Sequence, residues 1–322
     1  MKRRTFIKLS AAAAATGALG APRAFAASKE LIYMTPALDV PFWRIVSKGV
    51  EDAAKEAGYS FSALEAQNNA QKQLQNAQDA ITRGVAGIVI SPTDSSTCPS
   101  VLKLAEAAKI PVVICDIGTN EGNYVSFIAS DNTKGAHGVG EAVAAAAKAK
   151  GLTDAPYGMI TISLARINGQ KRTEGFRSAM DAAGYGKEIA LQQMQAYTAD
   201  ESFKFAQDML TGNPQMKAMF IESDVPALGA LRAIKAAHRT GDIIVGAFDG
   251  VPEFVDLLKS GELTAAGMQQ PWLMGNTAGK SMLDFIGGKA PEKEVLVDVM
   301  IATSGNIEQV LPTAKKTVFG EA

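Results

Sequence analysis

Apolar and polar positions alternate along the chain in a regular rhythm from Leu31 onward. Short apolar runs are followed by longer segments in which apolar residues recur with helical spacing, and a few turn residues separate the two. This rhythm is typical of parallel βαβ units. It predicts strands near residues 31–34, 61–64, 87–90 and 112–115, with helices that begin near Pro41, Gln71 and Thr97.

A second series of the same kind follows a turn-rich linker at residues 151–156. It predicts strands near residues 159–163, 189–194, 218–221 and 243–248, with helices that begin near Gly169, Asp200, Val225 and Pro252. Two such series predict an α/β protein with two doubly wound parallel sheets. Ligands of such sheets bind beyond the carboxyl ends of the strands, so the residues that directly follow each strand are the candidates for a binding site.

The N-terminal segment has the features of an export signal. A basic stretch with adjacent Arg3 and Arg4 precedes an alanine-rich apolar stretch and a small-residue cleavage site at residues 24–26. This pattern predicts a signal peptide over residues 1–26. The paired arginines resemble the twin-arginine signature, although Lys2 stands where Ser or Thr is usual. A basic amphipathic helix is the alternative. We therefore expect a protein exported to the periplasm by the twin-arginine route.

Composition narrows the function classes. Residues 1–26 hold five basic residues and no acidic ones, so the formal charge without them is 27 minus 33, or −6, instead of −1. This balance offers no electrostatic footprint for nucleic acid. With 322 residues and 47% hydrophobic composition, the chain can bury two modest cores or one large core. The two cysteines, Cys98 and Cys115, either form a single bridge or pack as small buried hydrophobes.

An enzyme is the first alternative that the sequence disfavours. Residues 275–281, GNTAGKS, resemble a phosphate-binding loop, but Met274 occupies the position of a required glycine. The apolar spacing of this segment predicts an amphipathic helix instead. His137 and His238 are the only histidines, which excludes a histidine-rich metal cluster and disfavours a Ser-His-Asp triad. We predict no catalytic activity, no cofactor and no metal ion.

Short motifs along the chain carry a family resemblance. They are Pro41-Phe42-Trp43 leading to Gly49, Gln67-Asn68-Asn69, Pro92-Thr93-Asp94-Ser95, Ile110-Pro111-Val112-Val113, Ala129-Ser130-Asp131-Asn132, Glu174-Gly175-Phe176, Ala227-Leu228-Gly229-Ala230 and Phe248-Asp249-Gly250. In this order and spacing, they resemble the ribose-type periplasmic binding proteins over nearly the whole chain after the export signal. Each motif is weak alone, so the resemblance depends on the series.

The resemblance implies a periplasmic binding protein type I fold, in which two α/β lobes close on a sugar. It implies chain crossings between the lobes near Asp131, near Gln269 and near Ile301. The N-terminal lobe would then comprise residues 30–131 and 270–300, and the C-terminal lobe residues 132–269 and 301–318. Each lobe is therefore expected to be discontinuous in sequence.

Chemistry favours four residues as contacts of a sugar or polyol. Such a ligand offers hydroxyls that both donate and accept, with C–H patches between them, so its site needs aromatic planes and planar polar groups. Phe42 and Trp43 stand where the family places stacking aromatics, although Trp43 alternatively packs in the core. Asp116 and Asp249 directly follow apolar strands, where a carboxylate accepts from neighbouring hydroxyls or caps the next helix.

Further candidate contacts come from the resemblance, position by position. They are Ser91 and Ser223 where the ribose relatives have Asn, Tyr197 where they have an aromatic residue, Gln269 where they have Gln, and Asp39 one residue before the position of a first-loop Asn, which is Val40 here. Two departures stand out, because Ile117 and Gln170 occupy the places of arginines that grip ribose through two forked donors. Ribose itself is therefore disfavoured, and another pentose, a tetrose derivative or an acyclic polyol fits better.

Two arginines near the second departure are candidate replacement donors. Arg166 and Arg172 lie on either side of Gln170, which stays a candidate contact itself, and Arg172 also matches a family arginine that supports the lobe. The resemblance implies a monomeric solute-binding protein that presents its ligand to an ABC permease by hinge closure. A periplasmic sensor for a chemoreceptor or sensor kinase stays open as an alternative. A sugar-responsive repressor is disfavoured, because it would carry a helix-turn-helix in place of the export signal.

Overall fold

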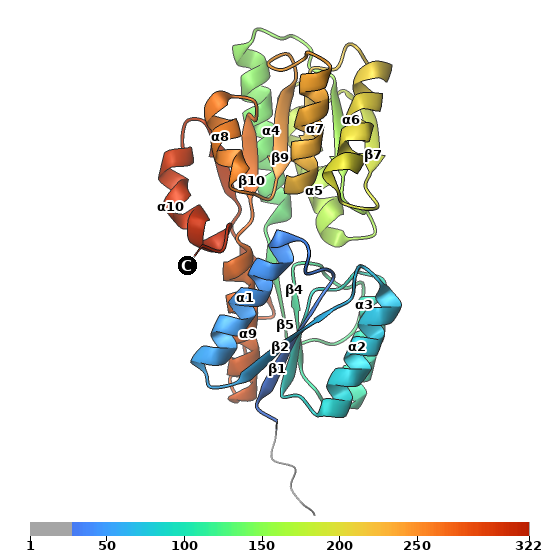
Figure 1. Cartoon of the computed structure of the whole chain (residues 1–322), viewed down its shortest axis with the longest axis vertical. Coiled ribbons are helices and arrows are strands. Elements are labelled where there is room, and N and C mark those ends of the chain that lie inside the picture. Colours follow the sequence, from blue (N-terminus) through green and yellow to red (C-terminus); the bar gives the residue numbers. More distant parts are fainter. Residues whose placement is uncertain (1–27, 322) are drawn as a thin grey trace, which may run out of the picture.

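The computed structural model describes residues 28–321, so the expected signal peptide lies outside the described residues. Two α/β lobes are stacked along the long axis of the molecule (Figure 1). The lobe that contains the first strand comprises β1 (Glu30–Thr35), α1 (Pro41–Glu56), β2 (Ser60–Glu65), α2 (Ala70–Arg83), β3 (Gly87–Ile90), α3 (Cys98–Ala107), β4 (Val112–Cys115), β5 (Ser126–Ser130), α9 (Pro271–Ile286) and β11 (Glu294–Val297). We call it the N-lobe.

The C-lobe holds the remaining elements. They are α4 (Asn132–Ala149), β6 (Tyr157–Thr161), α5 (Ile167–Ala182), β7 (Glu188–Gln193), α6 (Ala199–Gly212), β8 (Ala218–Ile221), α7 (Asp224–Ala236), β9 (Ile244–Phe248), α8 (Glu253–Ser260), β10 (Ala265–Met268), β12 (Met300–Thr303) and α10 (Ile307–Thr317). Strand order is β11-β5-β4-β3-β1-β2 in the N-lobe and β12-β10-β9-β8-β6-β7 in the C-lobe. The pairing is parallel except between β10 and β12, so the predicted α/β class with two doubly wound sheets is confirmed.

Each sheet is covered by helices on both faces, which explains why its central strands are continuously apolar. In the N-lobe, one core lies under α1 and α9 and the other under α2 and α3. In the C-lobe, one core lies under α4 and α5, and the other under α6, α7 and α8. The central strands β3, β4, β8 and β9 are buried along their whole length. These buried strands therefore fix the positions of the polar side chains that directly follow them.

The chain passes between the two sheets three times. The crossings lie at Asp131, between β5 and α4, at Gln269 and Gln270, between β10 and α9, and at Asp298 and Val299, between β11 and β12. The third crossing differs from the expected position near Ile301. Met300 and Ile301 already pair with Met268 and Gly267 of β10, so both belong to the C-lobe sheet.

The GNTAGKS segment is part of a helix, as its apolar spacing predicts. It lies within α9, which packs closely along α1. A Cβ on Gly275 would collide with the carbonyl oxygen of Val46, and a Cβ on Gly49 would collide with that of Trp272. The two glycines therefore let the backbones of α1 and α9 approach each other. This packing holds the N-terminus of α1, with its two aromatic residues, at the end of the N-lobe that faces the C-lobe.

The cysteines pack as small buried hydrophobes. Cys98 and Cys115 are free thiols and both are buried in the N-lobe. Burial raises the pKa of Cys98 to about 12, so its thiol stays protonated at neutral pH. Within residues 28–321, no helix is long and apolar enough to cross a membrane. The same part of the chain holds no group of three or more His, Cys, Asp or Glu side chains arranged to bind a metal ion.

Candidate functional site

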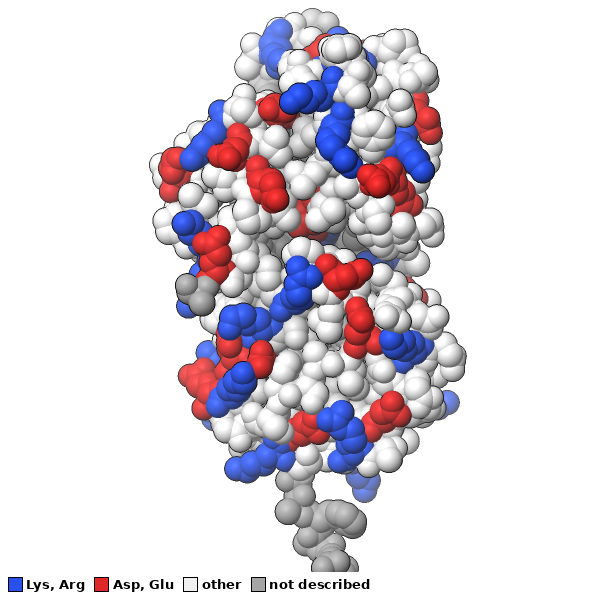
Figure 2. All heavy atoms as spheres, viewed as in Figure 1, with Lys and Arg blue, Asp and Glu red and all other residues white. Residues whose placement is uncertain are grey.

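A cavity of about 90 Å³ lies between the lobes, at the waist visible in the space-filling view (Figure 2). Its walls come from the strand ends and first helical turns of both lobes, together with one crossing residue. The lining residues are Asp39, Val40, Phe42, Trp43, Asn68 and Asp116 of the N-lobe, Ile162, Arg166, Asn168, Arg172, Ala196, Tyr197, Ser223, Asp224 and Asp249 of the C-lobe, and Gln269. A molecule in this cavity would contact both lobes at once.

Four of the lining residues adopt a left-handed backbone conformation although none is glycine. They are Asn68, Asp116, Tyr197 and Asp249, with φ between 52° and 67°. Asn and Asp tolerate this region better than other residues, whereas a bulky Tyr is an outlier there. Such strain persists only where the surrounding structure holds it, and it concentrates at binding sites. The sharp turns follow β2, β4, β7 and β9 and bring the four residues to the cavity wall.

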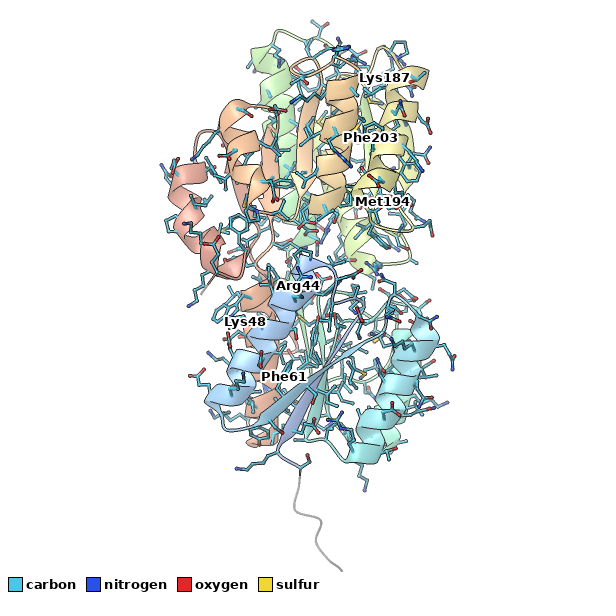
Figure 3. The ribbon with its side chains drawn as sticks, in the orientation of Figure 1. Arg44, Lys48, Phe61, Lys187, Met194 and Phe203 are labelled. Atoms are coloured by element: carbon cyan, nitrogen blue, oxygen red, sulfur yellow. The ribbon has the colours of Figure 1, made fainter. Side chains whose placement is uncertain are left out.

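Phe42 and Trp43 form the aromatic part of the cavity wall at the start of α1. Their rings are 4.8 Å apart, with an angle of 89° between their planes. Pro41 opens the helix, and Arg44, labelled in Figure 3, donates to the carbonyl oxygens of Leu38 and Asp39 at 2.9 and 2.8 Å. The loop before the helix is thereby fixed. Trp43 packs in the N-lobe core, as one of its two interpretations predicts, and it also lines the cavity, where stacking on a ligand stays a prediction.

The polar wall consists of buried carboxylates and amides. Asp249 accepts from Gln269 Nε2 and, at 3.5 Å, from Arg172 Nη1. Asp116 Oδ2 accepts from Asn168 Nδ2 at 3.0 Å. Within the described part of the chain, no donor reaches Asp116 Oδ1 or Gln269 Oε1, although both atoms are buried. Buried acceptors are normally paired, so these two oxygens have the capacity to accept from a molecule in the cavity.

Arg172 is the central cation of the cluster. Its Nε donates to Asn132 Oδ1 and its Nη1 to the Glu222 carbonyl oxygen, both at 2.8 Å. The guanidinium lies 4.2 Å from the centre of the Phe248 ring, and the side chain is 3% exposed. The residue therefore supports the C-lobe and also lines the cavity.

Burial makes the carboxyls around Arg172 easier to protonate. It raises the pKa of Asp116 to about 6, although the Arg172 guanidinium opposes the shift. It raises the pKa of Asp224 to about 7 and that of Glu222 to about 8 in the same way. Glu222 accepts from Thr173 Oγ1 at 2.6 Å and from the Ile162 backbone N–H at 3.0 Å. At neutral pH, these three carboxyls are therefore near the point at which they take up or lose a proton.

The first turn of α5 contacts the N-lobe directly, so the lobes are closed in this structure. Arg166 Nε donates to the Thr93 carbonyl oxygen at 3.0 Å, and its guanidinium lies 4.9 Å from the centre of the Tyr197 ring. The Ile167 backbone N–H donates to Ser95 Oγ at 3.2 Å. These hydrogen bonds, together with the one between Asn168 and Asp116, join the two lobes without any bound molecule.

The cavity includes all but two of the residues predicted as ligand contacts. Ser91 is buried beneath the cavity wall, where its hydroxyl lies 2.9 Å from the Tyr33 hydroxyl. Gln170 is exposed and donates to the Leu164 carbonyl oxygen at 2.7 Å. Neither position lines the cavity, because Ser91 precedes the turn and Gln170 lies on the outer side of α5. Both follow predicted strands, Ser91 directly and Gln170 at a distance, and the resemblance then assigned them as contacts.

Sequence analysis missed several lining residues. They are Val40, Asn68, Ile162, Asn168, Ala196 and Asp224. A signal existed for Val40, which holds the position of the family's first-loop Asn, for Asn68, which belongs to the quoted Gln67-Asn68-Asn69 motif, and for Asp224, which directly follows a candidate contact. Asn168 lies in the stretch that follows the strand predicted at residues 159–163, but nothing indicated its contact, which lies in the other lobe and depends on lobe closure.

Comparisons with known proteins agree with this arrangement. A family model described as periplasmic binding protein domain matches residues 31–290. The ribose import binding protein RbsB of Haemophilus influenzae is 31% identical over 82% of this chain and 88% of its own. The D-apiose import binding protein of Actinobacillus succinogenes is 30% identical over 86% of this chain and 89% of its own. The solved Caulobacter myo-inositol binding protein, bound to myo-inositol, has a TM-score of 0.80 and 26% identity over 87% of this chain and 95% of its own.

Proposed function

Because this chain belongs to the periplasmic binding protein family, we propose that it is the solute-binding component of a carbohydrate ABC importer. It captures a small sugar or sugar alcohol between its lobes and presents it to the membrane permease. The observation that carries this proposal is the inter-lobe cavity, which combines two aromatic rings with buried acceptors that no protein donor reaches within residues 28–321. A small molecule that carries hydroxyls and C–H faces can donate to these acceptors and stack on these rings.

The ligand class follows from the shape and chemistry of the cavity. Relatives are named for import of ribose and D-apiose, and one bound myo-inositol in its solved structure. Here Ile117 and Gln170 lack the forked donors expected for ribose, while Arg166 reaches the cavity from a different position. A cavity of about 90 Å³ suits a small molecule. We propose a monosaccharide other than ribose, or a polyol of similar size.

Lobe closure is the proposed mechanism of capture. The three crossings form the hinge, and a ligand that contacts both lobes stabilises the closed form by its differential affinity for that form. The permease then binds the closed lobes. We propose that the protein acts as a monomer. Signalling to a chemoreceptor or sensor kinase stays a prediction, which co-precipitation with a receptor would test.

Mass spectrometry of the molecule released from freshly purified protein tests the ligand class. Closed lobes retain a tightly bound ligand through purification, so we expect a single mass of polyhydroxylated composition. An amino acid, a peptide or an inorganic anion as the released molecule would contradict the proposal. The same measurement on a sample refolded from denaturant gives the background, because unfolding releases the contents of the cavity.

Export by the twin-arginine route is the proposed path to the periplasm. Arg3→Lys combined with Arg4→Lys is expected to leave most of the precursor in the cytoplasm, because this route depends on the arginine pair. Cell fractionation and immunoblotting measure the distribution. The matched control is Arg23→Lys, which makes the same substitution outside the pair and should be exported normally. Full export of the double variant would show that another route operates.

A further inference from the structure

Asn168 is the second residue of α5 in the C-lobe, yet its side chain contacts the N-lobe. Its Nδ2 donates to Asp116 Oδ2 at 3.0 Å, and its Oδ1 accepts from the Gly169 backbone N–H at 3.0 Å. The side-chain amide can therefore face only one way, because a backbone N–H needs the oxygen beside it. Asn168 is 4% exposed, so water competes little for these bonds. Its nitrogen is committed to the carboxylate of the other lobe.

The hydrogen bond from Asn168 makes the two carboxylate oxygens of Asp116 unequal. Oδ2 is occupied, whereas Oδ1 is buried, and no donor among the described residues reaches it. Asp116 lines the cavity and is held in a left-handed conformation with φ of 65°. Its backbone therefore sets the direction of the side chain, and Asn168 sets the rotation of the carboxylate. Together they leave Oδ1 as the unpaired carboxylate oxygen of a residue that lines the cavity.

The contacts of the two residues before Asn168 fix its position relative to the N-lobe. Arg166 Nε donates to the Thr93 carbonyl oxygen, and the Ile167 backbone N–H donates to Ser95 Oγ, so the first turn of α5 is anchored on the N-lobe. Thr93 and Ser95 are themselves buried. All of these bonds join residues of different lobes. The contact between Asn168 and Asp116 therefore exists only while the lobes are closed.

Several charged and titratable groups surround Asp116. Burial raises its pKa to about 6, the guanidiniums of Arg172 in the facing α5 and of Arg166 just before α5 lower it, and Asp249 after β9 raises it. Tyr33 of β1 and Cys115 of β4 also lie near it, and burial raises the pKa of both so that they stay neutral. A hydrogen bond donated to a carboxylate favours its ionised form. The Asn168 amide therefore helps to keep Asp116 ionised in the closed protein.

We propose that Asn168 is a positioning residue of the ligand site, which reaches across the closed cleft and orients Asp116 so that Oδ1 accepts from the bound sugar. This inference rests on the proposed function. It also couples closure to recognition, because the oriented carboxylate exists only when α5 contacts the N-lobe. Asn168 itself acts through Asp116, and its removal should therefore matter only while Asp116 is ionised.

Asn168→Ala tests this role through the pH dependence of affinity. Calorimetry first selects the tightest-binding probe among D-ribose, D-allose, D-apiose, myo-inositol and erythritol. At pH 8, we expect the variant to bind this probe roughly 10- to 100-fold more weakly, the usual worth of a hydrogen bond to a charged group. At pH 5, where Asp116 is largely protonated, the loss should shrink to a few-fold. An equal loss at both pH values, or none, would overturn the inference.

Asn168→Asp provides a second, opposite perturbation. It places two carboxylates side by side, so affinity at pH 8 should fall below that of Asn168→Ala and recover at pH 5, where the pair holds a proton. Failure to recover would count against the inference. Glu174→Ala, at an exposed position of the same helix, is the control and should match wild type. The unfolding midpoint of each variant is also measured, because a value near that of wild type shows that the variant is folded.

The two hypotheses fail in different ways. If the wild-type protein binds none of the probes at either pH, the proposed function fails and this inference fails with it. If wild type binds a probe and Asn168→Ala binds it equally well at pH 8, only the inference about Asn168 fails.

Discussion

Asp249→Asn is expected to lower the affinity for the bound sugar roughly 100-fold or more, because two neighbouring hydroxyls lose a charged acceptor. Asp249 follows β9 at the cavity wall, where Arg172 and Gln269 already orient its carboxylate. Asn removes the charge without straining the backbone, since it tolerates the left-handed φ of 67° at this position. Asp249→Ala should abolish binding but also strains the backbone. Calorimetric titration with the tightest-binding sugar measures both variants.

Asp256→Asn is the matched control for this prediction. It removes a carboxylate from an exposed position of α8, shortly after the same turn, and should leave affinity unchanged. An unfolding midpoint for Asp249→Asn near that of wild type would show that the loss of binding is local. Wild-type affinity in Asp249→Asn would remove Asp249 from the site.

Arg172→Met is expected to destabilise the protein by about 3–5 kcal/mol, because it leaves buried carboxylates without their central cation. For a chain of this size, that corresponds to a fall of roughly 10 °C in the unfolding midpoint. The carboxyls concerned are Asp116, Asp224 and Glu222, whose pKa values burial raises to about 6, 7 and 8. Methionine keeps most of the apolar contact with Phe248, so the change isolates the charge.

The pH dependence of this loss has a definite sign. These carboxyls have a higher pKa in the folded protein than the value of roughly 4 in the unfolded chain. Their unfavourable contribution to stability therefore grows as the pH rises above 4 and is complete above about 8. Arg172 opposes it by favouring the ionised forms. The loss in Arg172→Met should therefore be larger at pH 8 than at pH 5, where protonation removes much of the uncompensated charge.

Two further variants separate charge from packing. Arg172→Lys keeps the charge but not the forked geometry, so its midpoint should lie between those of wild type and Arg172→Met. Arg177→Met removes a half-exposed partner of Glu188 from the same helix and should cost no more than about 1 kcal/mol. Differential scanning calorimetry at both pH values measures all three. Equal losses for Arg172→Met at pH 5 and pH 8 would mean that packing on Phe248 dominates.

The regular rhythm of the sequence predicts the central strands well, because they are buried on both faces and read as continuous apolar runs. Missing from the prediction are β5, β10, β11 and β12. β10 consists largely of small residues, and β11 is a sheet edge with exposed Glu294 and Leu296. Neither segment has the run of large apolar residues by which the other strands were predicted. These strands flank the crossings, so the strand pattern offered no check on the third crossing, which the resemblance placed two residues too late.

The site was predictable where a side chain follows its own strand, and less so where closure creates a contact. Asp116 and Asp249 could be found from strand ends, since a buried strand fixes the place of the next residue. Asn168 lies in the stretch after β6, but its contact could not be found in this way, because the partner is separated by 52 residues and lies in the other lobe. The strand-end rule does not always suffice, because Ser91 directly follows β3 and does not line the cavity. Gln170, which the resemblance assigned as a contact, does not line it either.

Calorimetric titration of the wild-type protein at neutral pH tests sugar capture most directly. The panel comprises D-ribose, D-allose, D-apiose, myo-inositol, erythritol, an amino-acid mixture and inorganic phosphate. Capture between the lobes predicts saturable one-to-one binding of at least one of the sugars or polyols, with no detectable binding of the same molecule by Asp249→Ala. Binding of an amino acid or phosphate, with no heat from any of the sugars or polyols, would contradict it.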